Sequence, residues 1–270
     1  MTDAETETRP KGEVVATVQD GIGWVTFSNP TRYNALSFGM MESIPPMLQA
    51  LGADPDVKVV VMTGAGDKAF VSGADISEFG ERRTGPEARA EYDRAGEEAA
   101  AAWARLEKPV IAKIRGFCLG GGLRLALQAD IRIAAEGSQF AIPAARLGLG
   151  YGLGAVEPLV QLVGPSWAAE ILFSARRLSG EEGLRSGLVN RLVPPDQLDD
   201  QVLELAATIA ANAPLTVRAA KAAIQETGRR RSDLDRARIR EMVEACFLSE
   251  DYREGQRAFL EKRPPEFHGR

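Results

Sequence analysis

The chain has 270 residues, of which 44% are hydrophobic and 26% charged, and its formal net charge is −5. This length suits one large α/β domain with a small appendage. The negative charge gives no general attraction to nucleic acid or to an anionic membrane, and no apolar run approaches the roughly 20 residues that span a bilayer, so neither partner is expected.

The first elements are predicted by alternation and turn residues. Residues 1–12 are polar and acidic, and we expect them to form a disordered tail. Residues 14–18 and 22–27 alternate apolar and polar side chains around Asp20-Gly21, which indicates a β-hairpin. A helix is expected from Ser37, broken or bent near Pro45-Pro46.

The next stretch carries two glycines after an apolar strand. Residues 57–62 form a near-continuous apolar run, typical of a parallel strand covered on both faces. Gly64 and Gly66 follow, a spacing that superficially matches a dinucleotide fingerprint. That fingerprint requires a helix immediately after the glycines, whereas residues 68–73 read as extended chain. We therefore reject a dinucleotide site and predict a second turn with bare backbone N–H groups at residues 73–75.

The centre of the chain is residues 113–130. A long alanine-rich helix is predicted at 86–107 and a buried strand at 109–114, and three successive glycines, Gly120 to Gly122, then lead into a mostly buried helix. Glycine at such a turn admits a ligand close to the backbone and leaves the first helical N–H groups bare, which favours an anion or oxyanion. Tight packing of the turn is the alternative explanation.

The second half changes from alternating strands and helices to helices. A strand is predicted at 131–135, and the glycine-rich residues 138–158 are predicted to form a long functional loop. The expected later elements are helices at 165–175, 180–186, 196–212, 214–227, 233–248 and 250–260, with a short strand at 189–193. This order indicates an α/β core followed by a helical C-terminal region.

Scarce histidine and cysteine restrict the chemistry. The only histidine is His268, so a Ser-His-Asp triad or a histidine-based zinc centre is excluded and no metal site is expected. The two cysteines, Cys118 and Cys246, give no disulfide framework and favour a reducing, cytoplasmic location. Cys118 is interpreted as a buried small residue because no histidine can activate it.

Several phrases, in this order and spacing, resemble the crotonase superfamily, the enoyl-CoA hydratase/isomerase fold. They are KAFVSGADISEF, KPVIAKIRGFCLGGGLRLALQADIRIA, SQFAIPAARLGLGYGLGA, ARRLSGEEGLRSGLVNRLVP and SEDYREGQRAFLEKRPPEF. The resemblance implies an α/β fold with a four-turn ββα spiral core over residues 13–200 that binds acyl-CoA. It also implies a helical trimerisation region over 201–270, and homotrimers or hexamers made of two trimers.

The resemblance further implies how a thioester would be held. Two backbone N–H groups, those of Ala74 and Gly121, would bind the thioester oxygen, and coenzyme A would enter only as part of the substrate. Arg32 and Lys68 are candidates for phosphate contacts. The residues implied to lie along the acyl-CoA are Arg32, Ala35, Leu36, Lys68, Ala69, Ser72, Gly73, Asp75, Ile76, Leu119, Gly120, Pro143, Ala144 and Leu147.

Three positions depart from the hydratase pattern. Where hydratases of this family carry two glutamates, the chain has Arg124 and Ala144. Tyr151 stands where hydratases usually have proline, and a similar tyrosine occurs in relatives that decarboxylate methylmalonyl-CoA. Arg124 is therefore a candidate for binding a substrate carboxylate, or alternatively for a structural ion pair with Glu157 or Asp130. Glu157 is a further candidate acid.

Three hypotheses follow. The first is an acyl-CoA enzyme that stabilises a thioester enolate and decarboxylates a malonyl-type CoA. The second is an enoyl-CoA hydratase or isomerase in fatty-acid or related acyl-CoA metabolism, with Tyr151 or Glu157 as the acid–base group. The third is an acyl-CoA-binding protein without catalytic activity.

Overall fold

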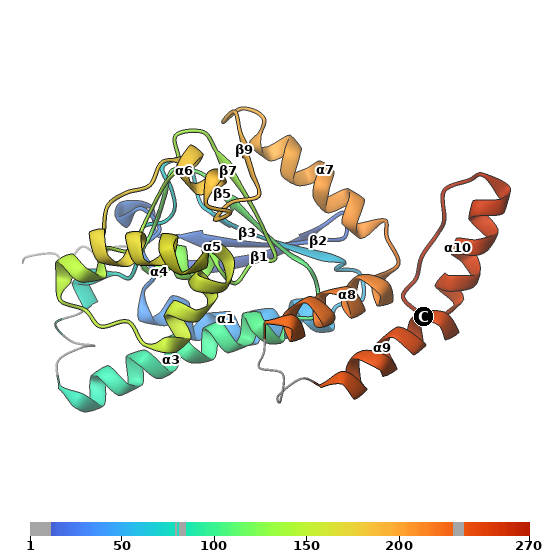
Figure 1. The fold of residues 1–270 in the computed structure, drawn as a ribbon, viewed down its shortest axis with the longest axis horizontal. Coiled ribbons are helices and arrows are strands. Elements are labelled where there is room, and N and C mark those ends of the chain that lie inside the picture. The colour runs from blue at the N-terminus through green and yellow to red at the C-terminus, as the bar shows by residue number, and fades with distance from the viewer. Residues whose placement is uncertain (1–11, 79, 81–84, 229–234) are drawn as a thin grey trace, which may run out of the picture.

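Two β-sheets and the helices around them form the body of the protein in the computed structural model, which describes residues 12–78, 80, 85–228 and 235–270. Residues 1–11, where we expected a disordered tail, lie outside the described residues. The larger sheet has the strand order β1-β2-β3-β5-β7-β9 and the smaller one β4-β6-β8 (Figure 1). The large-sheet strands are β1 (Glu13–Gln19), β2 (Ile22–Ser28), β3 (Val59–Gly64), β5 (Val110–Ile114), β7 (Ile131–Ala135) and β9 (Arg191–Val193).

The predicted N-terminal hairpin is confirmed. β1 and β2 pair antiparallel, and both residues of the connecting turn have positive φ, 51° at Asp20 and 75° at Gly21. Positive φ at both central residues is typical of the hairpin turn whose twist matches that of the strands. All the other neighbouring strands of the large sheet are parallel.

The chain alternates between the two sheets as it winds. After β3, β5 and β7 it passes directly into a short parallel strand of the small sheet: β4 (Ala69–Val71), β6 (Phe117–Leu119) and β8 (Gln139–Ala141). A helix or helical turn follows each short strand: η2 (Ile76–Glu78) and α3 (Pro86–Arg105), α4 (Gly121–Ala126), and η3 (Pro143–Leu147) with α5 (Leu153–Ser174). This repeated β-β-α unit confirms the predicted spiral α/β core.

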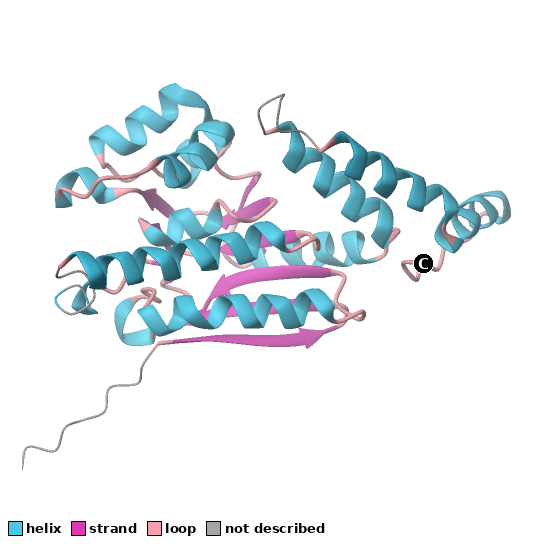
Figure 2. Cartoon of the chain, turned by 90° about the horizontal axis from the view of Figure 1, so that it is seen from below, coloured by secondary structure: helices cyan, strands magenta, loops and turns pink. Residues whose placement is uncertain are grey.

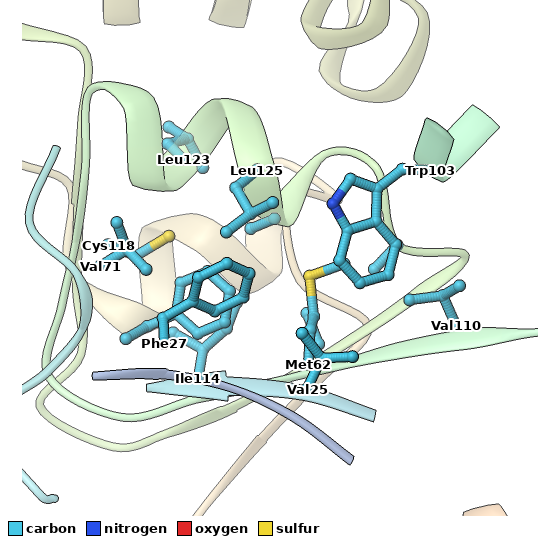
Figure 3. Close-up of a cluster of buried hydrophobic side chains, with 14 of the residues drawn as sticks. Val25, Phe27, Met62, Val71, Trp103, Val110, Ile114, Cys118, Leu123 and Leu125 are labelled. Atoms are coloured by element: carbon cyan, nitrogen blue, oxygen red, sulfur yellow. The ribbon is translucent and has the colours of Figure 1, made fainter. Parts of the chain in front are cut away.

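The large sheet is buried on both faces, as the apolar run before Gly64 predicted. Side chains alternate along β3, so that Val60 and Met62 enter the main core while Val59 and Val61 face the other way. That second face is covered by Leu198, Val202 and Ala206 of α7 (Leu198–Ala210). In the main core, Trp103 of α3 lies beside Met62 (Figure 3). Leu123 and Leu125 of α4 belong to the same cluster as Phe27 and Cys118 (Figure 3).

The helix expected to be broken or bent near Pro45-Pro46 is not broken. α1 (Phe38–Ala53) runs without interruption through Pro45 and Pro46, although each proline lacks the N–H that would bond to the preceding turn. The oxygen of Ser37 caps its first turn by accepting from the Met40 N–H, at 3.3 Å. α1 and α3 lie side by side (Figure 2), and α1 buries Met40, Ile44, Leu48 and Leu51 in the core, which outweighs the missing bonds.

The segment expected to be one long loop, residues 138–158, is largely structured. It contains β8, the 3-10 turn η3 and the start of α5. A second 3-10 turn, η1 (Pro30–Arg32), lies where the sequence indicated a turn. The expectation of a long loop is therefore wrong, because three-residue strands carry too little alternation to be recognised in the sequence.

The C-terminal half is helical, as predicted. After α6 (Gly180–Arg185), β9 and α7 come α8 (Pro214–Thr227), α9 (Arg236–Leu248) and α10 (Glu250–Glu261). α9 and α10 stand away from the sheets in both views (Figures 1 and 2), and α9 buries none of its residues within this chain. No helix of the described residues is long and apolar enough to cross a membrane.

Candidate active site

The candidate site lies at the carboxyl edge of the small sheet. Its three parallel strands β4, β6 and β8 end side by side, and the chain continues from them into residues 72–74, 120–121 and 142–144. Ligands of parallel α/β sheets bind outside the carboxyl ends of the strands. Three segments that are far apart in the sequence are thus gathered by one sheet edge.

The Ala74 amide has no acceptor in the described part of the chain. Residues 73–75 pair with Leu36: the Leu36 N–H donates to the Gly73 oxygen at 2.8 Å, and the Asp75 N–H donates to the Leu36 oxygen at 2.7 Å. This parallel pairing uses the amide of Asp75 and passes over that of Ala74. Gly73, with a φ of 125°, provides the turn that this arrangement requires.

The Gly121 amide likewise has no acceptor among the described residues. Gly120, with a φ of 52°, donates its N–H to the Ala141 oxygen at 2.7 Å and accepts from the Arg124 N–H at 3.0 Å. Gly121 is the first residue of α4, and its N–H has no acceptor among the described residues. A Cβ on Gly121 would lie 3.4 Å from the Ala74 nitrogen, so the two glycine-rich turns abut at their unused amides. Two such donors could bind one carbonyl oxygen.

The three central glycines have different tasks. A Cβ on Gly122 would come within 1.9 Å of the Val71 carbonyl oxygen, so α4 rests directly on the backbone of β4 at that point. Gly120 has a positive φ. A Cβ on Gly121 would have its closest neighbour, the Ala74 nitrogen, at 3.4 Å. The sequence left two explanations for these glycines, and they apply to different residues. Gly122 is needed for tight packing of the turn, whereas Gly121 leaves room for a ligand to come close to the backbone.

The two segments implied to lie along coenzyme A are joined to each other. The Ser72 N–H donates to the Tyr33 oxygen at 3.1 Å, and the Ser72 hydroxyl donates to the Arg32 oxygen at 3.0 Å. Arg32 forms an ion pair of 2.9 Å with the buried Asp75 carboxylate. That carboxylate also accepts the N–H and hydroxyl of Ser77, so Asp75 positions the Arg32 side chain.

The other predicted contacts differ in accessibility. Ala35, Leu36, Ala69, Gly73 and Ala144 are buried and have only backbone to offer. Ile76 and Leu147 are exposed, and Leu119, Gly120 and Pro143 are half-buried beside the glycine turn. Lys68 is exposed, and its ammonium group makes no hydrogen bond or ion pair with the described residues.

Arg124 lies on the open face of α4. Gly122, Leu123, Leu125 and Ala126 are buried, whereas Gly121 and Arg124 are only half-buried, and residues three apart share one face of a helix. The Arg124 guanidinium makes no ion pair or hydrogen bond with any described residue.

The two carboxylates considered as structural partners of Arg124 are engaged elsewhere. Asp130 accepts from Lys221 at 2.9 Å and from the Val110 N–H at 2.7 Å. Glu157 lies exposed on α5, near Gln161. The structural ion pair considered for Arg124 is therefore absent in the described part of the chain.

The segment after β8 places Tyr151 near the main core. η3 turns the chain immediately after Ile142, and Pro143 comes close to the glycine turn, 3.8 Å from the position of a Cβ on Gly120. Tyr151 then packs against the main hydrophobic cluster just before α5 begins. The Tyr151 ring is only partly buried, so one part of it contacts the core and another part is accessible to solvent.

Two features of this region were missed in the sequence. Phe38 and Tyr92 form an aromatic pair with centroids 6.3 Å apart, and their cluster packs against Ala74. Tyr33 and Phe117 form a second pair, with Arg177 over the Phe117 ring. Each pair joins residues far apart in the chain, and a single sequence does not show which distant residues will be in contact.

Cys118 is confirmed as a core residue. It is fully buried, and burial raises the pKa of its thiol, which keeps the thiol protonated and unreactive. No group of histidine, cysteine or acidic residues within the described ranges is arranged to hold a metal ion.

Fold and site together define an α/β protein of repeated β-β-α units whose glycine turns meet at one sheet edge. Residues 17–270 match the family model described as enoyl-CoA hydratase/isomerase. The chain belongs to this family of acyl-CoA enzymes.

The similar proteins cover almost the whole chain. A crotonyl-CoA hydratase of Syntrophomonas wolfei is 37% identical over 94% of this chain and 97% of its own length. A short-chain-enoyl-CoA hydratase of Clostridium acetobutylicum is 37% identical over 93% and 95%. The crystal structure of a putative enoyl-CoA hydratase/isomerase family protein from Hyphomonas neptunium superposes with a TM-score of 0.90 and 35% identity, covering 95% of this chain and 98% of that one.

Proposed function

We propose that this protein binds an acyl-CoA thioester and stabilises its enolate between the amides of Ala74 and Gly121. The observation that carries the proposal is the pair of adjoining amides that no described acceptor uses. Donors aimed at a developing oxyanion can each lower a barrier by about 3 kcal/mol, because they need no reorganisation during the reaction.

The proposed reaction is decarboxylation of a malonyl-type CoA. Arg124 and Ala144 stand where the family resemblance places the two hydratase carboxylates, and a guanidinium at neutral pH offers no lone pair to act as a base. Decarboxylation needs no base. The bond between the α-carbon and the carboxylate carbon breaks, CO₂ leaves, and the electron pair passes into the thioester enolate. A proton then adds to the α-carbon.

Arg124 and Tyr151 have defined tasks in this proposal. The Arg124 guanidinium shares a helix face with Gly121 and has no described partner, so it is available to hold the substrate carboxylate with two hydrogen bonds. Tyr151 orients that carboxylate or delivers the proton to the α-carbon. The enolate oxygen is held by the two amides throughout.

A second candidate is hydration or isomerisation of an enoyl-CoA. It is favoured by the names of the relatives at 37% identity, both of them hydratases. This function requires Tyr151 or Glu157 to replace the usual acid–base pair, and the exposed position of Glu157 on α5 makes Tyr151 the better candidate.

A panel of three thioesters separates the candidates. Release of CO₂ from methylmalonyl-CoA, without hydration of crotonyl-CoA or isomerisation of a 3-enoyl-CoA, would support decarboxylation. Addition of water to crotonyl-CoA at ordinary hydratase rates would support the second candidate and contradict the first. Binding of coenzyme A without turnover of any thioester would indicate a protein without catalytic activity.

The Arg124→Gln variant tests the carboxylate contact. We expect KM for methylmalonyl-CoA to rise about tenfold or more, because a hydrogen bond to a charged group contributes about 1.5–3 kcal/mol. The affinity for butyryl-CoA, which has no free carboxylate, should not change. Arg94→Gln on the exposed face of α3 is the matched control. Equal losses for both ligands would contradict a carboxylate contact.

The Tyr151→Phe variant tests the phenolic hydroxyl while keeping the packed ring. We expect the rate of decarboxylation to fall by roughly 10²-fold, within the range for loss of a proton donor, with CoA affinity largely unchanged. Tyr252→Phe, in the C-terminal region, is the control. An unchanged rate would remove Tyr151 from the mechanism.

We also propose that the helical C-terminal region mediates a homotrimer, alone or in a hexamer. Residues of α8, α9 and α10 line an open apolar groove of about 760 Å³, and Phe247, Leu248 and Leu260 are 60%, 71% and 81% exposed. Apolar exposure of this kind marks an association surface. Sedimentation velocity would establish the stoichiometry, and a monomer at micromolar concentration would contradict the proposal.

A further inference from the structure

The direction of the Ala74 amide is fixed by a hydrogen bond on the other side of its peptide group. In a trans peptide the carbonyl and the N–H point in opposite directions, and the Ala74 N–H shares its peptide plane with the Gly73 oxygen. That oxygen accepts from the Leu36 N–H at 2.8 Å. The Ala74 N–H therefore points away from Leu36, and any movement of Leu36 would turn it.

A side chain ties the same two segments together a little further along. Glu78, in η2, accepts the Phe38 N–H at 2.7 Å, although the two residues are 40 positions apart in the chain. η2 follows directly on the Ala74 turn, and the Glu78 N–H donates to the Asp75 oxygen at 3.1 Å. Two backbone hydrogen bonds at Leu36 and this side-chain bond hold the start of α1 against the Ala74 turn.

The Glu78 carboxylate occupies a position where a helix favours an anion. Phe38 is the first residue of α1, and the amides of a first helical turn have no acceptor within the helix. Ser37 caps the same turn locally, by accepting from the Met40 N–H. Glu78 serves α1 as a second cap, but unlike Ser37 it comes from the segment that carries Ala74.

Packing connects the same residues. Phe38, Met41, Tyr92 and Ala95 form a buried cluster, and Ala74 packs against it. Because Phe38 belongs to this cluster, a displaced start of α1 would move the Ala74 turn through side-chain contacts as well as through the hydrogen bonds at Leu36.

We propose that Glu78 is a positioning residue for the Ala74 amide. Its carboxylate holds the start of α1 against the Ala74 turn, so that the Leu36 N–H keeps the peptide between Gly73 and Ala74 in the orientation that aims its N–H at the thioester oxygen. Glu78 does not contact the substrate and takes no part in proton transfer. The assignment rests on the proposed function, in which that oxygen is held at Ala74 and Gly121.

Variants of Glu78 test whether its carboxylate affects the reaction. In Glu78→Ala we expect kcat for the best thioester of the panel to fall about tenfold or more, with KM within twofold of the parent protein, because a misaligned donor is lost mainly in the transition state. Glu78→Gln retains an oxygen that can accept from the Phe38 N–H and should restore most of this kcat. An unchanged kcat in Glu78→Ala would overturn the assignment.

Ser37→Ala is the matched control, since it removes a side-chain cap from the same helical turn and leaves the Ala74 segment untouched. We expect the urea midpoint to fall in Ser37→Ala as in Glu78→Ala, but kcat to stay at the parent value. Where Glu78→Ala does not fold, Glu78→Asp takes its place with the same expected loss of kcat, because its side chain is one methylene shorter. Equal losses of kcat in Ser37→Ala and in the Glu78 variant would show a general effect of helix stability and overturn the assignment.

An infrared measurement reports on the amide without turnover. The C=O stretch of bound butyryl-CoA, labelled with ¹³C at the carbonyl, should move to lower frequency in the parent protein, because aligned donors polarise the carbonyl. Glu78→Ala should show a smaller displacement, and Glu78→Gln the parent value. The same displacement in Glu78→Ala and the parent would overturn the assignment alone. No displacement and no turnover in the parent protein would refute the proposed function and the assignment with it.

Discussion

Replacing Gly121 by alanine is expected to reduce kcat by about 10²–10³-fold while the protein stays folded. The new methyl group would lie 3.4 Å from the Ala74 nitrogen, in the space that an oxygen bound to both amides must occupy. Loss of one oxyanion donor has an effect of this size. Stability should not suffer, because alanine is the better helix former and no backbone atom lies closer than that nitrogen.

The measurement is steady-state turnover of the best thioester from the panel, together with urea unfolding of the same preparation. Gly52→Ala in α1 is a matched control, since its Cβ also has its closest neighbour at 3.4 Å, the Leu106 side chain. That variant should retain both turnover and stability. Full activity of Gly121→Ala would contradict an oxyanion site between the two amides.

The same substitution one residue later is expected to destabilise the protein by about 3 kcal/mol or more. A Cβ on Gly122 would overlap the Val71 oxygen at 1.9 Å and the Val71 carbonyl carbon at 2.7 Å. Both belong to the backbone of β4, which is fixed by its pairing with β6, so α4 must move away from the sheet. Buried side chains of α4 such as Leu123 would move with it.

Urea denaturation of Gly122→Ala beside Gly121→Ala checks this expectation, because the two variants have the same composition and differ only in the position of one methyl group. Where Gly122→Ala gives no soluble protein, thermal unfolding in cell extract provides the comparison. A Gly122→Ala protein as stable as the parent would show that α4 does not rest on β4 as described.

Much of the core could be predicted from local pattern. The hairpin at Asp20-Gly21 was evident because its turn needs residues that accept positive φ, and the apolar run before Gly64 was evident because a strand covered on both faces has no polar side. Ser37 was correctly taken as the start of α1. Whether α1 breaks or continues at Pro45 was left open by the sequence, because packing against α3 and the core, which compensates for lost helical bonds, is not a local property.

The small sheet was only partly foreseen. Residues 68–73 read as extended chain, but β6 and β8 were missed, and β8 was assigned to a loop. A strand of three residues has no measurable period, and it becomes a strand only because another strand lies beside it. The glycine turns were therefore recognised individually, while the sheet edge that brings them together was not.

The sequence alone determined the alternation of strands and helices, the resemblance to the enoyl-CoA hydratase/isomerase family and the identity of the residues at positions 74, 121, 124 and 151. These are local properties, because periodicity, turn chemistry and motif spacing are carried by neighbouring residues. Only the tertiary structure decided that Leu36 forms hydrogen bonds with Gly73 and Asp75 and leaves the Ala74 amide unused, that Asp130 is engaged by Lys221, and that Tyr33 meets Phe117. Each of these depends on which distant segments the sheets place together, and no local pattern encodes that choice.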